Sequence, residues 1–175
     1  MVDVKKVKLA KKGNAQAFQE LIEQEKVKLY KMAYIYMKNE HDALEVFQET
    51  VYKTLVSIKS LKEEKYFSTW VTKILINTAI EFLRKQKKIV PMEKEVLDRN
   101  IQPFQTAVVE QIDLLASIKG LEEKYKSVLL LRFYKDYSIK QIAELLDCPE
   151  GTVKTNIHRG IILLREKIKE GCVNE

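Results

Sequence analysis

The sequence predicts an all-α fold, with two small helical domains joined by a flexible linker. The 175 residues include only five glycines and three prolines and are rich in Lys, Glu, Leu and Ile, a composition typical of long helices. Apolar residues recur at steps of three and four along both halves, as they do on the buried face of a helix. Between the halves, residues 89–106 contain two of the three prolines and no such period. We therefore expect domains at residues 1–88 and 110–175 and a linker at 89–109.

The first domain begins with a predicted helix whose buried face runs from Phe18 to Tyr36 at helical spacing. A break near Asn39 separates it from a second helix at residues 42–58, for which Asp42 is the expected N-cap. The apolar residues of this second helix fall at steps of three or four. They form the predicted buried stripe Leu44, Phe47, Val51, Leu55 and Ile58.

A third helix, predicted at residues 68–85, is apolar over most of its circumference except for one polar strip. The spacing of three or four places the members of the strip on one side of the helix. They are Lys73, Asn77, Glu81, Arg84, Lys85 and Lys88. Phe67 and Trp70, three residues apart at the helix start, are expected to pack in the core. For Tyr66, a core position and an exposed position both remain open.

In the second domain, apolar residues at helical spacing lead into a predicted helix at residues 122–134. Ser138 and Gln141 then form a capping-box pattern, in which each side chain can bond the backbone amide of the other residue. This pattern predicts the start of a short helix that ends at Leu146.

A tight turn separates this short helix from the last predicted helix of the chain. Asp147 or Cys148 is its expected N-cap, and Pro149 is its expected first residue. Apolar residues from Val153 to Ile168 should face inward. The polar residues of its first turns should face outward, namely Thr152, Lys154, Thr155, Asn156, His158 and Arg159.

Two helices joined by a tight turn, the second with a polar face, form a helix-turn-helix, which is one way in which proteins read the DNA major groove. Asn can pair through two hydrogen bonds with adenine and Arg with guanine, while Thr and Lys can hold phosphates or base edges. The six outward residues of the last helix are therefore the candidate DNA contacts. The alternative is an ordinary helical hairpin with a solvated polar face.

The charge of the chain also indicates a polyanionic partner. The formal net charge is +6 with a pI near 9.1, and residues 1–90 carry 18 basic and 11 acidic side chains, an excess of +7. Two cysteines cannot form a disulfide framework, and the first residues lack the apolar core of a secretory signal. No uninterrupted apolar stretch approaches the length of a membrane span. We expect a soluble, cytoplasmic protein without direct membrane insertion.

No pattern in the sequence predicts an enzyme or a metal centre. The two histidines and two cysteines lack the CxxC or HxxxH spacing of a zinc site. No Ser/His/Asp set, glycine-rich phosphate loop or matched carboxylate pair indicates catalysis. We therefore expect no catalytic residue, no metal and no obligatory cofactor.

The second predicted helix carries an acidic strip on this otherwise basic domain. Glu45 and Glu49 lie one turn apart, a like-charge arrangement that costs about 0.2–0.5 kcal/mol in an isolated helix. The strip is either a docking face for a basic partner or a solvated face moderated by Lys53, four residues beyond Glu49. Spacing alone leaves both interpretations open.

Three segments in order, DALEVFQETVYKTL, YFSTWVTKILINTAIEFLRKQKK and YSIKQIAELLDCPEGTVKTNIHRGIILLREKI, resemble the sigma-70 family, specifically its extracytoplasmic-function group. The likeness covers nearly the whole chain. It implies core-polymerase binding by the acidic helix, through Asp42, Glu45, Gln48 and Glu49. It implies minus-10 DNA contacts from Tyr66, Lys73, Asn77, Arg84, Lys85 and Lys88. The six outward residues of the last helix would read minus-35 DNA.

The resemblance also implies partners for each domain. The first domain would dock on the clamp helices of the polymerase β′ subunit and melt the minus-10 element of promoter DNA, and the second would hold the β flap. Residues 59–66 correspond to a loop that captures an unstacked base, which fits the general physics of single-strand binding. An anti-sigma protein that covers the polymerase-binding faces is a further implied partner. The linker permits both a compact free form and an extended bound form.

Two other functions remain open from the residues alone. One is a stand-alone helix-turn-helix transcriptional regulator, whose first domain would serve dimerisation or sensing. Such a regulator should bind its duplex without polymerase, usually as a dimer on a repeated half-site. The other is a helical scaffold without a nucleic-acid role, which the outward face of the last helix argues against.

Overall fold

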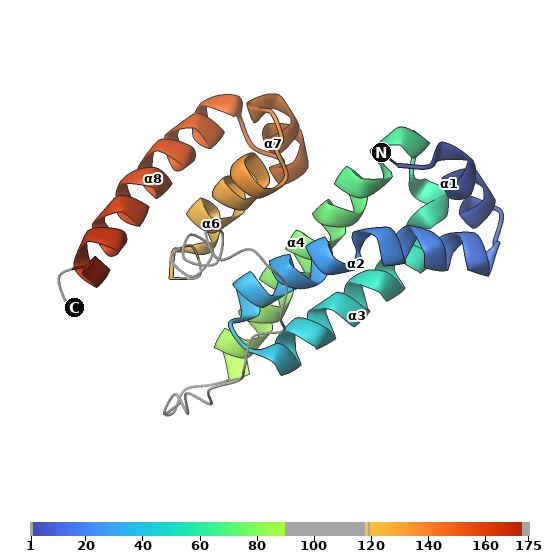
Figure 1. Cartoon of the computed structure of the whole chain (residues 1–175), viewed down its shortest axis with the longest axis horizontal. Helices are drawn as coiled ribbons and strands as arrows, with labels where there is room; N and C mark the ends of the chain where they lie inside the picture. Colours follow the sequence, from blue (N-terminus) through green and yellow to red (C-terminus); the bar gives the residue numbers. More distant parts are fainter. Residues whose placement is uncertain (1, 90–117, 119, 173–175) are drawn as a thin grey trace.

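The computed structural model describes residues 2–89, residue 118 and residues 120–172. Within these ranges the regular structure is helical throughout, which confirms the predicted all-α fold. Figure 1 shows two groups of helices, and we call α1 to α4 the N-terminal bundle and α6 to α8 the C-terminal bundle. The predicted linker at residues 89–109 lies, apart from Ile89, outside the described residues.

The N-terminal bundle has short 3-10 helices between its third and fourth α-helices. Its elements are α1 (Val4–Lys11), α2 (Ala15–Met37), α3 (Glu40–Ser57), η1 (Ile58–Ser60), η2 (Glu64–Tyr66) and α4 (Phe67–Ile89). Side chains cap the first three α-helices, because Asp3, Asn14 and Asn39 each accept a hydrogen bond from a first-turn amide. These caps explain where the helices begin.

α2 forms the centre of the N-terminal bundle. It packs against α1, α3 and α4, and its predicted inward residues from Phe18 to Tyr36 are buried. Leu29, Met32 and Ala33 have no exposed surface at all. The helix ends at Met37, because the next residue, Lys38, adopts the left-handed conformation with φ at 67°.

α3 begins two residues earlier than predicted, because its N-cap is Asn39 and not Asp42. The Asn39 side chain accepts a hydrogen bond from the Asp42 amide at 2.8 Å and donates one to the Asp42 carboxylate at 2.8 Å. The Asp42 carboxylate also accepts a hydrogen bond from Gln86 of α4 at 2.9 Å. Asp42 therefore joins the start of α3 to the end of α4.

The buried face of α3 is rotated by about one residue from the predicted stripe. Ile58 is buried and Phe47 and Val51 are half-buried, as predicted, but Leu44 and Leu55 are 45% and 51% exposed. Smaller residues take the central positions, namely Ala43, Val46, Thr50 and Thr54. Both threonine hydroxyls donate to the carbonyl four residues earlier, at 2.7 Å, so their burial leaves no polar group unpaired.

The C-terminal bundle contains a widened turn that the sequence did not reveal. Its described elements are α6 (Glu123–Leu129), the π-helical segment η3 (Leu130–Tyr134), α7 (Ile139–Leu146) and α8 (Glu150–Cys172). The predicted helix at residues 122–134 is present, but its last five residues are π-helical and not α-helical. The Lys135 amide donates to the Leu130 carbonyl, five residues back, at 3.1 Å.

The first helix of the helix-turn-helix begins and ends as predicted. The Ser138 hydroxyl accepts from the Gln141 amide at 3.2 Å, and the Ser138 amide donates to the Gln141 side chain at 2.9 Å. This complete capping box starts α7, which ends at Leu146. Its inward residues Ile142 and Leu145 are buried.

The turn between α7 and α8 differs from the prediction in its cap. Asp147 ends α7 in the left-handed conformation, with φ at 52°. The amides of Thr152 and Val153 donate to the Pro149 carbonyl at 2.9 and 3.2 Å, so Pro149 stands at the cap position of α8. The predicted caps, Asp147 and Cys148, are part of the turn instead.

α8 packs closely on α6 at Gly160. A β-carbon at this position would lie 3.0 Å from Leu129 Cδ1 and 3.4 Å from Tyr125 Cβ. Val153 and Leu164, two of the predicted inward residues, are buried about two turns before and one turn after Gly160. The missing side chain at Gly160 therefore determines how closely the two helices approach.

Replacing Gly160 with Val should destabilise the C-terminal bundle. The branched side chain would overlap Leu129 and force α6 and α8 apart, at a cost of about 1–3 kcal/mol. Gly151 of the same helix is the matched control, because a β-carbon there meets nothing within 4 Å. Thermal unfolding followed by circular dichroism should give a lower midpoint for Gly160→Val than for Gly151→Val. Equal midpoints would contradict this packing role.

Candidate functional site

The outer face of α3 combines acidic and apolar side chains. We define this face as the exposed residues Leu44, Glu45, Gln48, Glu49, Tyr52, Leu55 and Val56. The predicted acidic pair lies in its first half, whereas its second half is apolar, with Tyr52 63% and Val56 65% exposed. The sequence prediction missed this half because it assigned Leu55 to the core. Uncovered apolar groups beside charged ones are typical of a protein-binding surface.

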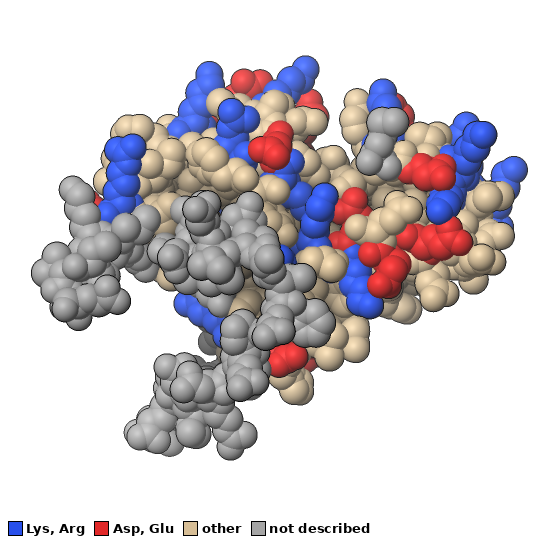
Figure 2. All heavy atoms as spheres, viewed as in Figure 1, with Lys and Arg blue, Asp and Glu red and all other residues tan. Residues whose placement is uncertain are grey.

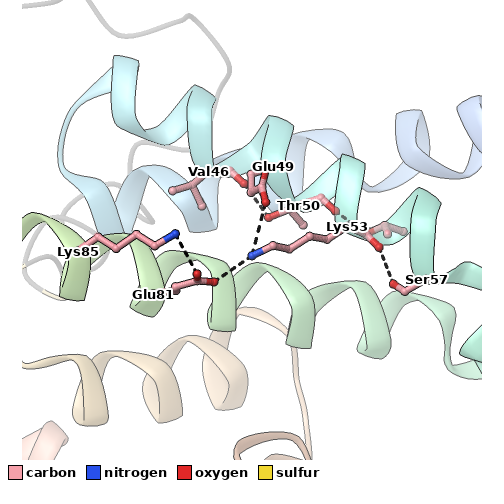
Figure 3. Close-up of polar contacts among 8 residues, drawn as sticks. Val46, Glu49, Thr50, Lys53, Ser57, Glu81 and Lys85 are labelled. Carbon is pink, nitrogen blue, oxygen red and sulfur yellow. Dashed lines mark hydrogen bonds and ion pairs between the residues drawn. The ribbon is translucent and has the colours of Figure 1, made fainter.

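Lys53 connects the outer face of α3 to α4, as Figure 3 shows. Its ammonium lies 3.6 Å from the Glu49 carboxylate on its own helix and 3.0 Å from Glu81 on α4. Lys85 contacts Glu81 at 3.0 Å as well. Lys85 and Lys53 together hold the pKa of the Glu81 carboxyl below its usual value. The charge of Glu49 is therefore moderated, whereas Glu45 has no ion pair within the described part of the chain.

His41, Asp42 and Glu45 lie close together at the start of α3. Their nearest ligand-type atoms all lie within 4.8 Å of one another. Asp42 already accepts hydrogen bonds from Asn39 and Gln86, and the other two side chains are exposed to solvent. These contacts describe a solvated corner of α3 and do not require a metal ion.

The predicted polar strip lies on the surface of α4. Asn77 and Arg84 are exposed, and Lys73 is half-buried. Lys85 is exposed, but its ammonium already contacts Glu81. The side chain of Lys88 lies outside the described part of the chain. Asn77 and Arg84 are thus the strip residues most open to a ligand.

Three aromatic residues surround the start of α4. Phe67 is fully buried, as predicted, and Trp70 is half-buried with its ring centroid 6.3 Å from that of Phe67. Tyr66 is 48% exposed, so the exposed alternative is the one that the structure adopts. The Lys65 ammonium lies 4.8 Å from the centre of the Tyr66 ring. The end of the 59–66 segment therefore offers an aromatic surface beside a cation.

The N-terminal half of α8 presents the predicted polar residues. Five of the six are exposed, namely Thr152, Lys154, Thr155, His158 and Arg159. Asn156 is half-buried. The Thr155 hydroxyl donates to the Gly151 carbonyl at 2.9 Å, so it can only accept a hydrogen bond from a ligand. Lys154 and Arg159 have no ion-pair partner among the described residues, which leaves both charges available to a polyanion.

Two buried polar contacts join the bundles. The Tyr36 hydroxyl of α2 lies 2.5 Å from the Ser127 hydroxyl of α6. Ser127 donates its own proton to the Glu123 carbonyl at 2.7 Å, so Tyr36 is the donor in the contact between bundles. Lys135 pairs with Glu25 of α2 at 3.4 Å, with side-chain exposures of only 5% and 14%. These polar contacts join α2 to the C-terminal bundle, in addition to the packing of α4 on α7.

An open cleft of ≈ 430 Å³ lies between the bundles. Its lining includes Ile80, Leu83 and Arg84 from α4 and Thr152 and Asn156 from α8. Predicted nucleic-acid contacts from different bundles therefore face one narrow space.

Comparison with known proteins is consistent with these surfaces. Residues 21–89 match the family Sigma-70 region 2, and residues 111–164 match the family Sigma-70, region 4. RNA polymerase sigma factor SigV of Bacillus subtilis (strain 168) is 36% identical over 78% of this chain and 81% of its own length. ECF RNA polymerase sigma factor SigW of the same strain is 30% identical over 97% of this chain and 98% of its own.

Two solved structures share the fold. The sigma factor RpoE from Bartonella quintana, solved in complex with the anti-sigma factor NepR, has a TM-score of 0.74 at 20% identity. The match covers 89% of this chain and 98% of that one. CnrH, solved with the cytosolic domain of CnrY, has a TM-score of 0.72 at 18% identity over 97% and 99% of the two chains.

None of the described helices is both long and apolar enough to cross a membrane.

Replacing Glu25 with Gln should loosen the contact between the bundles. Burial lowers the pKa of the Lys135 ammonium, and Glu25 partly offsets this effect. Without the carboxylate, the buried ammonium loses its counter-charge, at a cost of about 1–3 kcal/mol. Small-angle X-ray scattering at neutral pH should therefore show a larger radius of gyration.

The matched control for this variant is Glu23→Gln. Glu23 is exposed on the same helix and pairs with Lys26 of α2 at 3.2 Å. This control should keep the original radius of gyration. An unchanged radius for Glu25→Gln as well would show that the ion pair does not hold the bundles together.

Proposed function

Because the chain belongs to the sigma-70 family, in its extracytoplasmic-function group, we propose that it binds core RNA polymerase and directs it to a dedicated set of promoters. It then helps to open the DNA at the minus-10 element. The chemistry of RNA synthesis belongs to the polymerase, in the cytoplasm, and this chain supplies recognition. The observation that carries the proposal is the presence of three separate ligand-facing surfaces, on α3, α4 and α8.

The outer face of α3 supports docking on the clamp helices of the polymerase β′ subunit. Tyr52, Leu55 and Val56 expose apolar surface whose burial against a partner would be favourable. Glu45 and Glu49 add negative charge, which would orient a basic partner surface and speed its approach. The apolar half would thus supply most of the affinity, and the acidic half would orient the partner surface during docking.

The surfaces of α4 and the 59–66 segment support contacts with an opened minus-10 strand. Unpaired bases expose flat faces that stack on aromatic rings, and Tyr66 offers such a ring. Asn77 and Arg84 can donate hydrogen bonds to phosphates or base edges, and Lys73 is a further cation of the same strip. This division assigns strand capture to the N-terminal bundle.

The first turns of α8 support recognition of minus-35 DNA in the major groove. Asn156 and Arg159 can each make two hydrogen bonds to one base, whereas Lys154 and His158 suit phosphates. The capping box at Ser138 and the turn at Pro149 fix α7 relative to α8, so α8 can enter the groove as a rigid element.

The arrangement of the bundles represents, in this proposal, a closed form that opens when polymerase binds. Arg84 and Asn156 line the same cleft, so the bundles must separate before each residue can contact a different promoter element. Opening would break the Tyr36–Ser127 and Lys135–Glu25 contacts. It would also expose Arg84 and Asn156 to DNA. Contacts with the β′ clamp and the β flap would supply the free energy for this step.

An anti-sigma protein is a further proposed partner. The structural neighbour from Bartonella quintana was solved with a protein of that kind. In this chain, the apolar half of the outer face of α3 is the surface that such an inhibitor would cover, because covering it would block docking on polymerase.

The direct test adds the purified chain to core polymerase with a library of promoters and sequences the transcripts. Transcripts should begin downstream of a shared pair of minus-35 and minus-10 elements. Absence of both core binding and initiation would overturn the proposal. Tight binding of the free chain to a duplex as a dimer would instead favour a stand-alone regulator.

Replacing Val56 with Asp should weaken binding to core polymerase by at least about tenfold. A charge placed in the apolar half of the outer face of α3 would be desolvated on docking, and tenfold corresponds to about 1.4 kcal/mol. Val27→Asp on α2 is the matched control, because Val27 is 62% exposed and Val56 is 65% exposed. Fluorescence anisotropy with labelled chain measures both affinities. Equal effects at the two positions would rule out a specific docking face.

Replacing Asn156 with Ala should change promoter choice without changing core affinity. The lost base contact should cost about 1–3 kcal/mol at one base pair of the minus-35 element and relax discrimination there. Arg165→Ala, also exposed on α8 but more than two turns further on, is the control. Sequencing transcripts from a promoter library randomised at minus-35 reports the change. A uniform loss at all promoters would assign Asn156 to the phosphate backbone instead.

A further inference from the structure

α1 carries a ridge of lysines that the proposed function does not use. Lys5 and Lys8 are three residues apart on one side of the helix, and Lys12, four residues further on, is the residue that caps its end. All three are exposed. None of them has an ion-pair partner among the residues that the structure describes. α1 also precedes residue 21, where the match to Sigma-70 region 2 begins.

The opposite side of α1 is fixed to the N-terminal bundle. Val7 has no exposed surface and Ala10 is 5% exposed. Lys6 pairs with Glu20 of α2 at 2.6 Å. These contacts give α1 a defined orientation, so the ridge faces solvent in a fixed direction.

Lys11 attaches α1 to the segment proposed to capture a base. Its ammonium donates to the Leu61 carbonyl at 2.8 Å and to the Glu64 carboxylate at 3.0 Å. The hydrogen bond from Lys11 lowers the pKa of Glu64, and the charge of Lys8 contributes in the same direction. Lys8 is therefore close enough to the segment for its charge to be felt there.

The acidic groups near the ridge are already engaged. Glu63 pairs with Lys65 at 2.9 Å, Glu64 pairs with Lys11, and the Asp3 carboxylate accepts amide hydrogen bonds at the start of α1. Lys59 and Lys62 are exposed on the same segment, also without an ion pair in the described structure. In Figure 2, basic side chains project at the end of the molecule where Figure 1 places α1, with acidic side chains between them. The charge left for a ligand is thus positive.

We propose that α1 is an accessory binding element for the sugar-phosphate backbone of the unpaired promoter strand. Lys5, Lys8 and Lys12 would hold phosphates next to the nucleotides that residues 59–66 engage. Flexible lysine ammonium groups act as point charges without base readout, so the ridge contributes affinity and not sequence preference. The inference rests on the proposed function, because it requires promoter DNA to reach this end of the bundle.

The test uses holoenzyme assembled from the full chain and core polymerase. The probe is a promoter fragment recovered from the transcript sequencing, with its non-template strand left unpaired through the minus-10 element. Affinity is measured over a series of KCl concentrations for the original chain and for a variant with Lys5→Gln, Lys8→Gln and Lys12→Gln. Loss of three phosphate contacts to a single strand should reduce the slope of log K against log salt by about 2.

A variant with Lys26→Gln, Lys28→Gln and Lys38→Gln is the matched control, because it removes the same charge from exposed lysines elsewhere on the bundle. Its salt slope should stay close to the original. An unchanged slope in the ridge variant, or an equal reduction in the control, would overturn the proposal. Weaker core binding by the ridge variant would also overturn it, since the ridge would then face polymerase.

A photo-reactive benzoylphenylalanine at position 8 identifies the partner directly. The proposal expects a crosslink to the unpaired strand of the probe, and a crosslink to a polymerase subunit would contradict it. Failure of the original chain to bind core polymerase would instead contradict the proposed function itself. The original chain could bind core polymerase and promoter while the ridge substitutions have no effect. That result would contradict this inference and leave the proposed function in place.

Discussion

The buried hydroxyl of Tyr36 is the contact on which the relation between the two bundles depends. Burial raises the pKa of this hydroxyl, so it remains a neutral donor, and the Ser127 hydroxyl is its acceptor. Lys126, itself only 2% exposed, lies with its ammonium 5.4 Å from the centre of the Tyr36 ring. A buried hydroxyl without a partner costs about 1–3 kcal/mol, so a shifted docking of the bundles would be penalised. This polar junction therefore sets the position of one bundle against the other.

A junction of this kind would suit the opening of the bundles proposed above. When the bundles separate, Tyr36, Glu25 and Lys135 regain hydrogen bonds to water, so opening does not leave these polar groups unpaired. An apolar junction of the same size would expose hydrophobic surface on opening and would resist separation more strongly. The polar groups of the junction thus define how α2 meets the C-terminal bundle, and water could replace their contacts if the bundles separated.

The sequence predicted the parts of the fold that depend on local patterns. The capping box at Ser138, the inward face of α2 and the polar turns of α8 each follow from residues within about four positions of one another. The buried face of α3 did not follow, because its helix has apolar residues on two sides. Leu44 and Leu55 were assigned to the core by hydrophobicity, whereas close helix packing selected Ala43 and Thr50. Hydrophobicity alone cannot distinguish a core face from a face that awaits a partner.

The contacts between the bundles had no local signal at all. In the sequence, Lys126 and Lys135 are typical of solvated lysines, and their burial depends on residues of α2 about ninety or more positions away. The same limit applied to Lys11, whose partners lie fifty or more positions later in the chain. Long-range polar pairs of this kind require the fold before they can be recognised.

The Lys53 contacts explain how surfaces on different helices can act together. Lys53 joins Glu49 on α3 to Glu81 on α4, and Lys85 joins the same carboxylate from α4 itself. All of these groups are solvent-accessible, so the pairs add little stability. Only the Lys53–Glu81 pair crosses from α3 to α4, and it favours one rotation of α4 against α3. Together with the buried packing of α3 on α4, this pair relates the docking face of α3 to the polar strip of α4. A partner held on α3 consequently determines where the strip of α4, and any strand bound to it, must lie.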